Sequence, residues 1–233
     1  MMNERILMIE TSTECCSAAL SEGDRILASR IDETPRMQSS LLAPYIVEVL
    51  QEAGLTALDL DAVAVSEGPG SYTGLRVGVS TAKGLCFGAG KPLLGIDTLQ
   101  ILACQALTVI PGLTRDLHRI VAMLDARRME VYAATFDTTG RKCSDTAAVI
   151  LDETSYSEEL AAGRVLFIGT GVEKFQAVCH HPNASFQPCF PLATAMLQPS
   201  REALQKKEFE DVAYFEPFYL KDFVAGVTKH AIL

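Results

Sequence analysis

A glycine-rich segment of the sequence has the composition of a phosphate-binding loop. It runs from Gly68 to Gly84 as GPGSYTGLRVGVSTAKG and follows the apolar run AVAV at residues 62–65. A P-loop needs lysine and then serine or threonine directly after a glycine, whereas Lys83 here is preceded by alanine and followed by glycine. The dinucleotide fingerprint G-x-G-x-x-G also fails, because Thr73 stands in place of its third glycine. Neither phosphate motif is present, although a turn before a helix start still presents free amides to an anion.

Two acidic residues end corresponding strands of the two halves of the chain, where they could serve an ATPase that uses Mg²⁺. Glu10 ends the first expected strand, and Asp125 ends the corresponding strand of the second half of the chain. Carboxylate oxygens are suitable ligands for Mg²⁺ beside nucleotide phosphates. On this interpretation the vestigial nucleotide or phosphate contacts are Glu10, Ser12, Gly68, Gly70 and Asp125. On the structural interpretation, Glu10 caps a turn and Asp125 pairs with Arg127 or Arg128.

Other catalytic chemistry finds no support in the residue pattern. The four histidines contain no H-x-x-x-H pair, which would bring two imidazoles to one metal ion on a helix. The seven cysteines contain no C-x-x-C pair, and the G-x-S-x-G elbow of serine hydrolases does not occur. We therefore expect no metal site, no catalytic residue and no peptidase activity in this chain.

Small residues recur at every fourth position of the glycine-rich segment. On a helix from about residue 73 to 88, Gly74, Gly78 and Ala82 form one stripe with almost no side chain. Glycine inside a helix costs about 0.5 to 1 kcal/mol relative to alanine, so close approach of another backbone is the expected reason for the stripe. That backbone belongs either to the chain's own sheet or first helix, or to a partner subunit.

These residues are positioned by an α/β pattern that occurs twice. Residues 38–53 form the clearest helix, with apolar positions on one broad face. The first half has expected strands at 5–9, 16–20, 26–31, 62–66 and 93–96; the second has strands at 120–124, 131–136, 147–151 and 165–168, with helices at 155–162 and 172–179. We predict two tandem ribonuclease-H-like mixed-sheet units, the plan of actin, Hsp70 and sugar kinases (ASKHA).

The boundary between the two units is placed around Pro111 and Gly112. The predicted domains are residues 1–108 and 109–233, with a tail helix near 192–207 packing back on the first unit. The formal charge of −9 opposes direct binding of a polyanion such as a nucleic acid. No stretch of sequence is long and apolar enough for a membrane span, so we expect a cytoplasmic protein.

Several motifs together resemble the TsaB family. The longest is EGPGSYTGLRVG from Glu67 to Gly78, followed by AKGL at 82–85. Shorter ones are IETST at 9–13, DARRMEVY at 125–132, GTG at 169–171 and PFYL at 217–220. The resemblance covers nearly the whole chain in order.

The resemblance implies an accessory role in attaching threonylcarbamoyl to N6 of adenosine 37 in tRNAs that read codons beginning with A. It implies pairing with a TsaD-like catalytic subunit, association with a TsaE-like ATPase, and a homodimer through the same surface when the chain is alone. The expected interface on the two helices comprises Leu42, Tyr45, Ile46, Val49, Gly74, Val77, Gly78, Thr81 and Ala82. No intrinsic cofactor is expected, and ATP or ADP at the subunit interface stays open.

Two functions remain open at this point. The first is the noncatalytic interaction subunit, which reaches tRNA only through its partners. The second is a Mg²⁺-dependent ATPase or phosphotransferase of the actin-like superfamily, which would use Glu10 and Asp125. The missing phosphate motifs favour the first.

Overall fold

The first body of the molecule is built on a five-stranded mixed sheet. The computed structural model describes residues 3–109 and 116–220. The sheet has the strand order β3-β2-β1-β4-β5. Its strands are β1 (Arg5–Glu10), β2 (Cys16–Glu22), β3 (Arg25–Asp32), β4 (Ala62–Gly68) and β5 (Leu93–Asp97). The first three strands are antiparallel neighbours, whereas β4 runs parallel to β1 and β5 parallel to β4.

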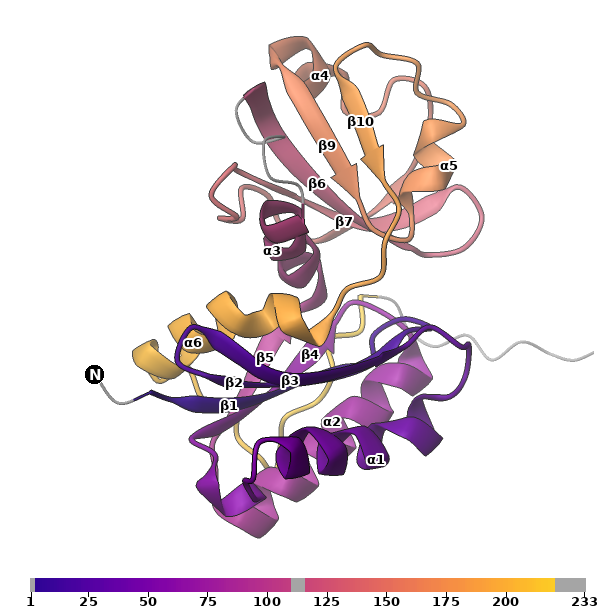
Figure 1. The fold of residues 1–233 in the computed structure, drawn as a ribbon. Helices are drawn as coiled ribbons and strands as arrows, with labels where there is room; N and C mark the ends of the chain where they lie inside the picture. Colours follow the sequence, from indigo (N-terminus) through magenta and orange to yellow (C-terminus); the bar gives the residue numbers. More distant parts are fainter. Residues whose placement is uncertain (1–2, 110–115, 221–233) are drawn as a thin grey trace, which may run out of the picture.

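The second body repeats this topology. Its sheet has the order β10-β9-β6-β7-β8, which read from the other end matches the first sheet strand for strand. The strands are β6 (Leu117–Asp125), β7 (Glu130–Phe136), β8 (Ala147–Ile150), β9 (Arg164–Ile168) and β10 (Ala184–Gln187). The predicted fold class of two tandem mixed-sheet units is therefore confirmed, and Figure 1 shows the two bodies one above the other.

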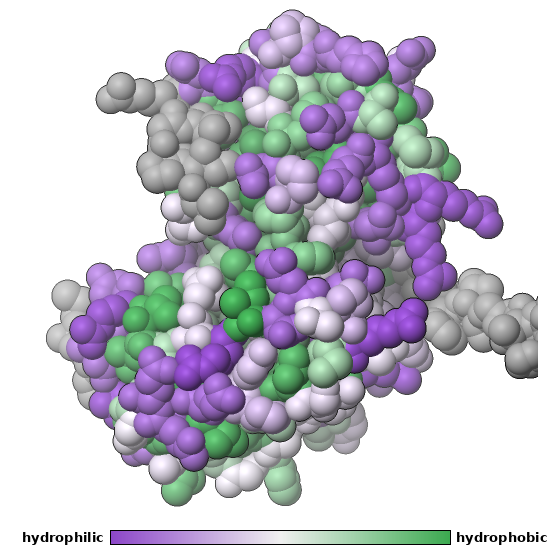
Figure 2. Space-filling model, turned by 45° about the vertical axis from the view of Figure 1, so that its right-hand side comes forward, coloured by the Kyte–Doolittle hydropathy of each residue, from purple (hydrophilic) through white to green (hydrophobic). Residues whose placement is uncertain are grey.

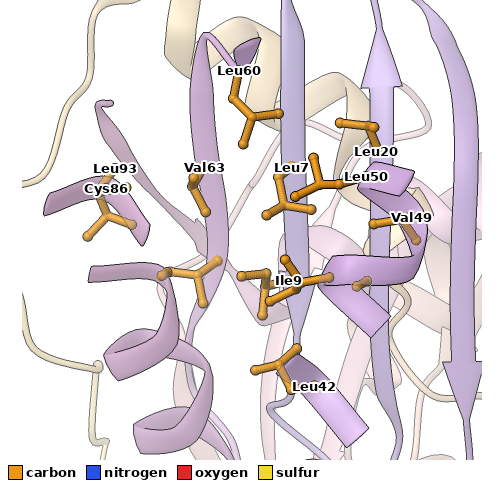
Figure 3. Close-up of a cluster of buried hydrophobic side chains, with 14 of the residues drawn as sticks. Leu7, Ile9, Leu20, Leu42, Val49, Leu50, Leu60, Val63, Cys86 and Leu93 are labelled. Atoms are coloured by element: carbon orange, nitrogen blue, oxygen red, sulfur yellow. The ribbon is translucent and has the colours of Figure 1, made fainter. Parts of the chain in front are cut away.

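Helices α1 (Gln38–Glu52) and α2 (Tyr72–Ala89) cover one face of the first sheet. Their apolar side chains enter one core with the strands. In Figure 3, Leu42, Val49 and Leu50 of α1 point toward strand residues such as Leu7 and Ile9. The 3₁₀ helix η1 (Ala57–Asp59) joins α1 to β4. The amphipathic pattern that predicted these helices thus reports burial against the chain's own sheet.

The opposite face of the first sheet is covered by segments from further along the chain. These are α3 (Thr98–Val109), the 3₁₀ helix η3 (Ala193–Met196) and α6 (Leu197–Lys206). Ile101, Met196 and Ala203 pack with Ile6 and Met8 in a second core. Residues 193–206 follow all ten strands in the sequence and yet lie on the first body (Figure 1).

Two short helices complete the second body: α4 (Ser157–Ala162) and α5 (Val172–Gln176). The proposed boundary at Pro111 and Gly112 lies outside the described residues, and the division at 108 stays a prediction. Hydrophilic side chains are spread over both bodies (Figure 2). Within residues 3–109 and 116–220, no helix has the length and apolar character needed to cross a bilayer.

Candidate functional site

A cleft of about 1270 Å³ lies between the two bodies. The first body contributes the turn after β1, with Ser12 and Thr13, and the segment Pro69–Thr73 that leads into α2. The second body contributes the turn after β6, from Leu124 to Arg127. Equivalent strand ends of the two repeats therefore face the same cavity. This is where a ligand would contact both halves of the molecule at once.

The start of α2 is tied to the turn after β1. Ser71 caps the helix by accepting a hydrogen bond from the Gly74 amide at 3.3 Å, and its own amide donates to the Ser12 carbonyl at 2.6 Å. The Thr11 hydroxyl donates to the Gly74 carbonyl at 2.8 Å. A Cβ on Gly74 would overlap the Thr11 carbonyl oxygen. Glycine is therefore required here by the chain's own backbone.

Glu10 does not reach the cleft, which corrects its predicted role as a nucleotide contact. The side chain is fully buried; Oε1 accepts a hydrogen bond from the Ser12 amide at 2.5 Å, whereas Oε2 has no hydrogen-bond partner among the described residues. This is the turn-capping geometry. Burial raises the pKa of Glu10 to about 7. A carboxyl enclosed in this way is not available to bind an ion in the cavity.

Asp125 does line the cleft, but its charge is already paired. Lys174 on α5 approaches Oδ2 at 2.9 Å. Oδ1 accepts a hydrogen bond from the backbone amide of Arg127 at 2.6 Å. The cationic partner is thus Lys174 rather than the neighbouring arginines named from the sequence.

The five predicted nucleotide contacts are only partly brought together. Ser12, Gly70 and Asp125 line the cleft. Gly68 is not among the lining residues, and a Cβ there would overlap the Phe218 carbonyl oxygen. This corrects Gly68 in the same way as Glu10.

The cleft also contains polar groups that were not predicted. Thr13 Oγ1 and Gln105 Oε1 are buried and, like Ser12 Oγ, have no hydrogen-bond partner among the described residues. Such groups can bind water or a polar ligand. Gln105 lies on α3, a helix that was not predicted, and Thr13 ends the IETST motif, which was not interpreted as part of a site. The tertiary fold alone brings these side chains to the cleft.

The expected partner interface needs a larger correction. Six of its nine residues are buried by the chain itself: Leu42, Ile46, Val49, Gly74, Gly78 and Ala82. A Cβ on Gly78 would overlap the Thr11 hydroxyl, so the small-residue stripe faces the first sheet and its turn. The other three, Tyr45, Val77 and Thr81, are half-buried.

The solvent side of the two helices carries a different set of residues, here called the outer face: Val47, Val77, Gly84, Phe87 and Gly88. Phe87 is 86% exposed and Val47 is 50% exposed. A Cβ on Gly84 or Gly88 would meet nothing within 4 Å. No contact within the described chain explains glycine at these two helical positions. Beside this face, a groove between α1 and α2 is lined by Ser39, Tyr72, Thr73, Arg76, Val77, Ser80 and Thr81.

Comparison with known proteins finds a matching family model, similar sequences and similar solved structures. A family model described as TsaD, tRNA N6-adenosine threonylcarbamoyltransferase, matches residues 32–229. The tRNA threonylcarbamoyladenosine biosynthesis protein TsaB of Escherichia coli is 30% identical over 228 residues, which cover 95% of this chain and 96% of that protein. The solved structure of YeaZ from Pseudomonas aeruginosa is 29% identical, with a TM-score of 0.82, and covers 93% of this chain and 100% of that one.

A more distant structure supports the fold alone. Component A of (R)-2-hydroxyglutaryl-CoA dehydratase from Acidaminococcus fermentans is 12% identical, with a TM-score of 0.51. The alignment covers 88% of this chain and 99% of that one. The likeness agrees with the two-unit ASKHA architecture described above.

Proposed function

Because the chain belongs to the TsaB family of tRNA threonylcarbamoyladenosine biosynthesis proteins, we propose that it serves this pathway as a noncatalytic subunit that binds a TsaD-like catalytic chain. In this role it would carry no active site of its own and would support the partner's. Assembly with a TsaE-like ATPase, contact with tRNA only through partners, and a homodimer of the isolated chain belong to the same proposal. Any ATP or ADP would then bind at the subunit interface.

The observation that carries this proposal is the outer face of α1 and α2. Glycine in a helix interior costs about 1 kcal/mol relative to alanine, and this applies to Gly84 fully and to Gly88, in the last turn of α2, only in part. No contact within the described chain offsets that cost at Gly84 or Gly88. A partner backbone that packs closely on this surface would offset it. Phe87, one turn from Gly84 and largely exposed, would supply apolar area to the same contact.

The state of the two carboxylates supports a noncatalytic chain. Glu10 is enclosed and caps a turn, and Asp125 is held by Lys174. A Mg²⁺-dependent phosphotransferase needs carboxylates that are free to face the ion and its water ligands. In this structure neither side chain is free in that sense.

Docking can be tested with a variant that leaves the fold intact. Gly84→Leu places a side chain in open space and adds helix propensity, so the chain should fold normally. It should weaken association with a TsaD-like chain at least tenfold in sedimentation velocity of the mixed subunits. Gln205→Leu, an exposed change on α6, is the matched control and should bind as the unmodified chain does. Equal association of all three proteins would remove the outer face from the proposal.

A second function is kept because of the unpartnered polar groups in the cleft. Ser12, Thr13 and Gln105 offer hydrogen bonds that a nucleotide could use, so an actin-like ATPase remains the alternative. Steady ATP hydrolysis by the isolated chain, lost in Asp125→Asn, would favour that alternative. Absence of turnover with normal docking would favour the accessory subunit.

A further inference from the structure

The last described segment of the chain, residues 208–220, is here called the C-terminal strap. It leaves α6, crosses the edge of β5 and runs along α2 to the cleft (Figure 1, yellow). The Glu210 amide donates to the Leu93 carbonyl at 2.9 Å, and the Phe218 amide donates to the Glu67 carbonyl at 2.7 Å. Lys83 of α2 donates to the carbonyls of Ala213 and Phe215 at 3.2 and 2.9 Å. The strap is therefore held mainly through its backbone.

A carboxyl group lies beneath the strap. Glu67, at the end of β4, is mostly buried, and Oε2 shares the space above Gly95 with the ring of Phe215. Among the hydrogen bonds found in the described part of the chain, none is donated to the Glu67 side chain. The strap thus encloses an acidic group without satisfying its charged form.

The charged groups that face Glu67 come from three separate elements. Asp97 at the end of β5 and Glu210 on the strap are both acidic, and Lys142 from the loop before β8 is the single basic group in this set. Lys142 is itself paired with Asp97 at 2.5 Å. Burial, reinforced by the charges of Asp97 and Glu210, raises the pKa of Glu67 to about 7. The docked strap places the Phe215 ring beside this carboxyl and adds the charge of Glu210 to those that raise its pKa.

We propose that the strap is a proton-controlled clasp, which stays docked while Glu67 is protonated and opens when Glu67 ionises. An ionised Glu67 needs water, and lifting Phe215 and Glu210 lets water reach it. Lifting also relieves repulsion between Glu67 and Glu210. The opposing contributions are the backbone hydrogen bonds and the packing of Phe215, which favour the docked strap at every pH.

Opening of the clasp would alter two surfaces. Tyr219 packs on Tyr72 with ring centroids 5.0 Å apart and accepts a hydrogen bond from Arg76 at 3.2 Å. Tyr72 and Arg76 line the groove between α1 and α2, and residues 218–220 line the cleft. Release of the strap would therefore reshape the edge of the docking surface. This consequence rests on the proposed function, whereas the clasp itself does not.

Hydrogen exchange of the full chain, followed by NMR from pH 5 to 8, tests the clasp. The amides of Glu210 and Phe218, which donate to carbonyls of β5 and β4, are the reporters, with rates corrected for intrinsic exchange. Their opening equilibrium should rise by up to tenfold per pH unit between 4.5, the ordinary pKa of a glutamate, and about 7, because one proton is released on opening in that range, and it should level off at higher pH. Glu67→Gln should abolish this pH dependence and keep both amides protected. The control, Glu208→Gln, removes an exposed charge at the start of the strap and should keep the dependence.

A second variant covers the case in which Glu67→Gln fails to fold. Glu210→Gln removes the strap's own charge, so it should reduce opening at pH 8 relative to the unmodified chain. Protection of both amides that does not change with pH, or a pH response that survives Glu67→Gln, would overturn the clasp. The readout uses the chain alone. Loss of partner binding with an intact pH response would instead count against the proposed function.

Discussion

At the scale of single residues, the glycines on the two sides of α2 have opposite effects on the stability of the chain. Gly78 faces inward, where a Cβ would overlap the Thr11 hydroxyl. Gly84 faces outward, where a Cβ would meet nothing within 4 Å. The first glycine is required by the fold of this chain. The second is unfavourable in the isolated chain, and a bound partner is what would explain it.

This contrast predicts opposite changes in stability. Gly78→Leu should lower the free energy of unfolding by about 3 kcal/mol or prevent folding, because the added atoms have no room. Gly84→Ala should raise it by up to about 1 kcal/mol through helix propensity. Urea unfolding followed by circular dichroism measures both. Similar effects for the two substitutions would contradict the burial described for α2.

Glu10 predicts how stability depends on pH. A carboxyl whose pKa is raised on folding stabilises the native state fully below its unfolded pKa, and this contribution is lost as the pH rises through the folded value. For Glu10 the window runs from 4.5 to about 7. Glu10→Gln keeps an acceptor for the Ser12 amide and should be more stable than the unmodified chain at pH 8 by about 3 kcal/mol.

Urea unfolding at pH 5, 6, 7 and 8 would measure the Glu10 effect. Glu67 has a raised pKa as well, so part of the slope should remain in Glu10→Gln and should disappear when Glu67→Gln is added. An unchanged slope in the double variant would show that other groups control the pH response.

At the scale of elements, the sequence predicts most strands and both long helices of the first body. β1, β4, α1 and α2 were expected within a few residues of their bounds: the two strands from short apolar runs, α1 from its apolar periodicity, and α2 from small residues at every fourth position. α3 was not predicted, since its sequence TLQILACQALTV is apolar on nearly all sides and gives no amphipathic signal. β10 was missed because its four residues, ASFQ, are too few to show alternation.

The candidate site was harder to predict than the elements that carry it. A periodic stripe tells which residues share one face of a helix, but not whether that face covers the chain's own sheet or a partner. The apolar residues of α1 and the small residues of α2 both turned out to be internal. Residues that were not singled out as site residues, such as Thr13 and Gln105, are placed in the cleft by the tertiary fold.

The element that seals the second face of the first sheet gives a further prediction. Met196 of η3 is fully buried in a core with Ile6 and Met8. Met196→Ala should lower the free energy of unfolding by about 3 kcal/mol, because it leaves a cavity in that core. The exposed Gln205→Ala on the adjoining α6 should change it by less than about 0.5 kcal/mol. Urea midpoints of the two variants provide the comparison.

At the scale of the whole molecule, the two halves repeat one topology but are not structurally independent. The first body takes its strands from residues 5–97 but its second layer partly from residues 193–206. The strap then crosses the same body again before it reaches the cleft. The chain therefore forms the sheet of the first body, then the sheet of the second body, and then packs on the first body again. We therefore expect the first sheet to be stable only when residues 193–206 are present.

The predicted division at residue 108 can be tested on this basis. A fragment of residues 1–108 contains all five strands of the first sheet, together with α1, α2 and nearly all of α3. It lacks Ala193, Met196 and Ala203, which cover Ile6, Met8 and Ala64 in the intact protein. Exposure of such an apolar sheet face removes stabilisation of about 25 cal/mol for each Å² left uncovered, and a domain has only about 5–15 kcal/mol to lose.

The fragment should therefore bind a hydrophobic dye and unfold without a cooperative transition in urea. Addition of a separate chain of residues 109–233 should restore cooperativity if the missing layer is the cause. A fragment that unfolds cooperatively alone would instead show that residues 1–108 are a complete folding unit and that the returning segment is dispensable for it.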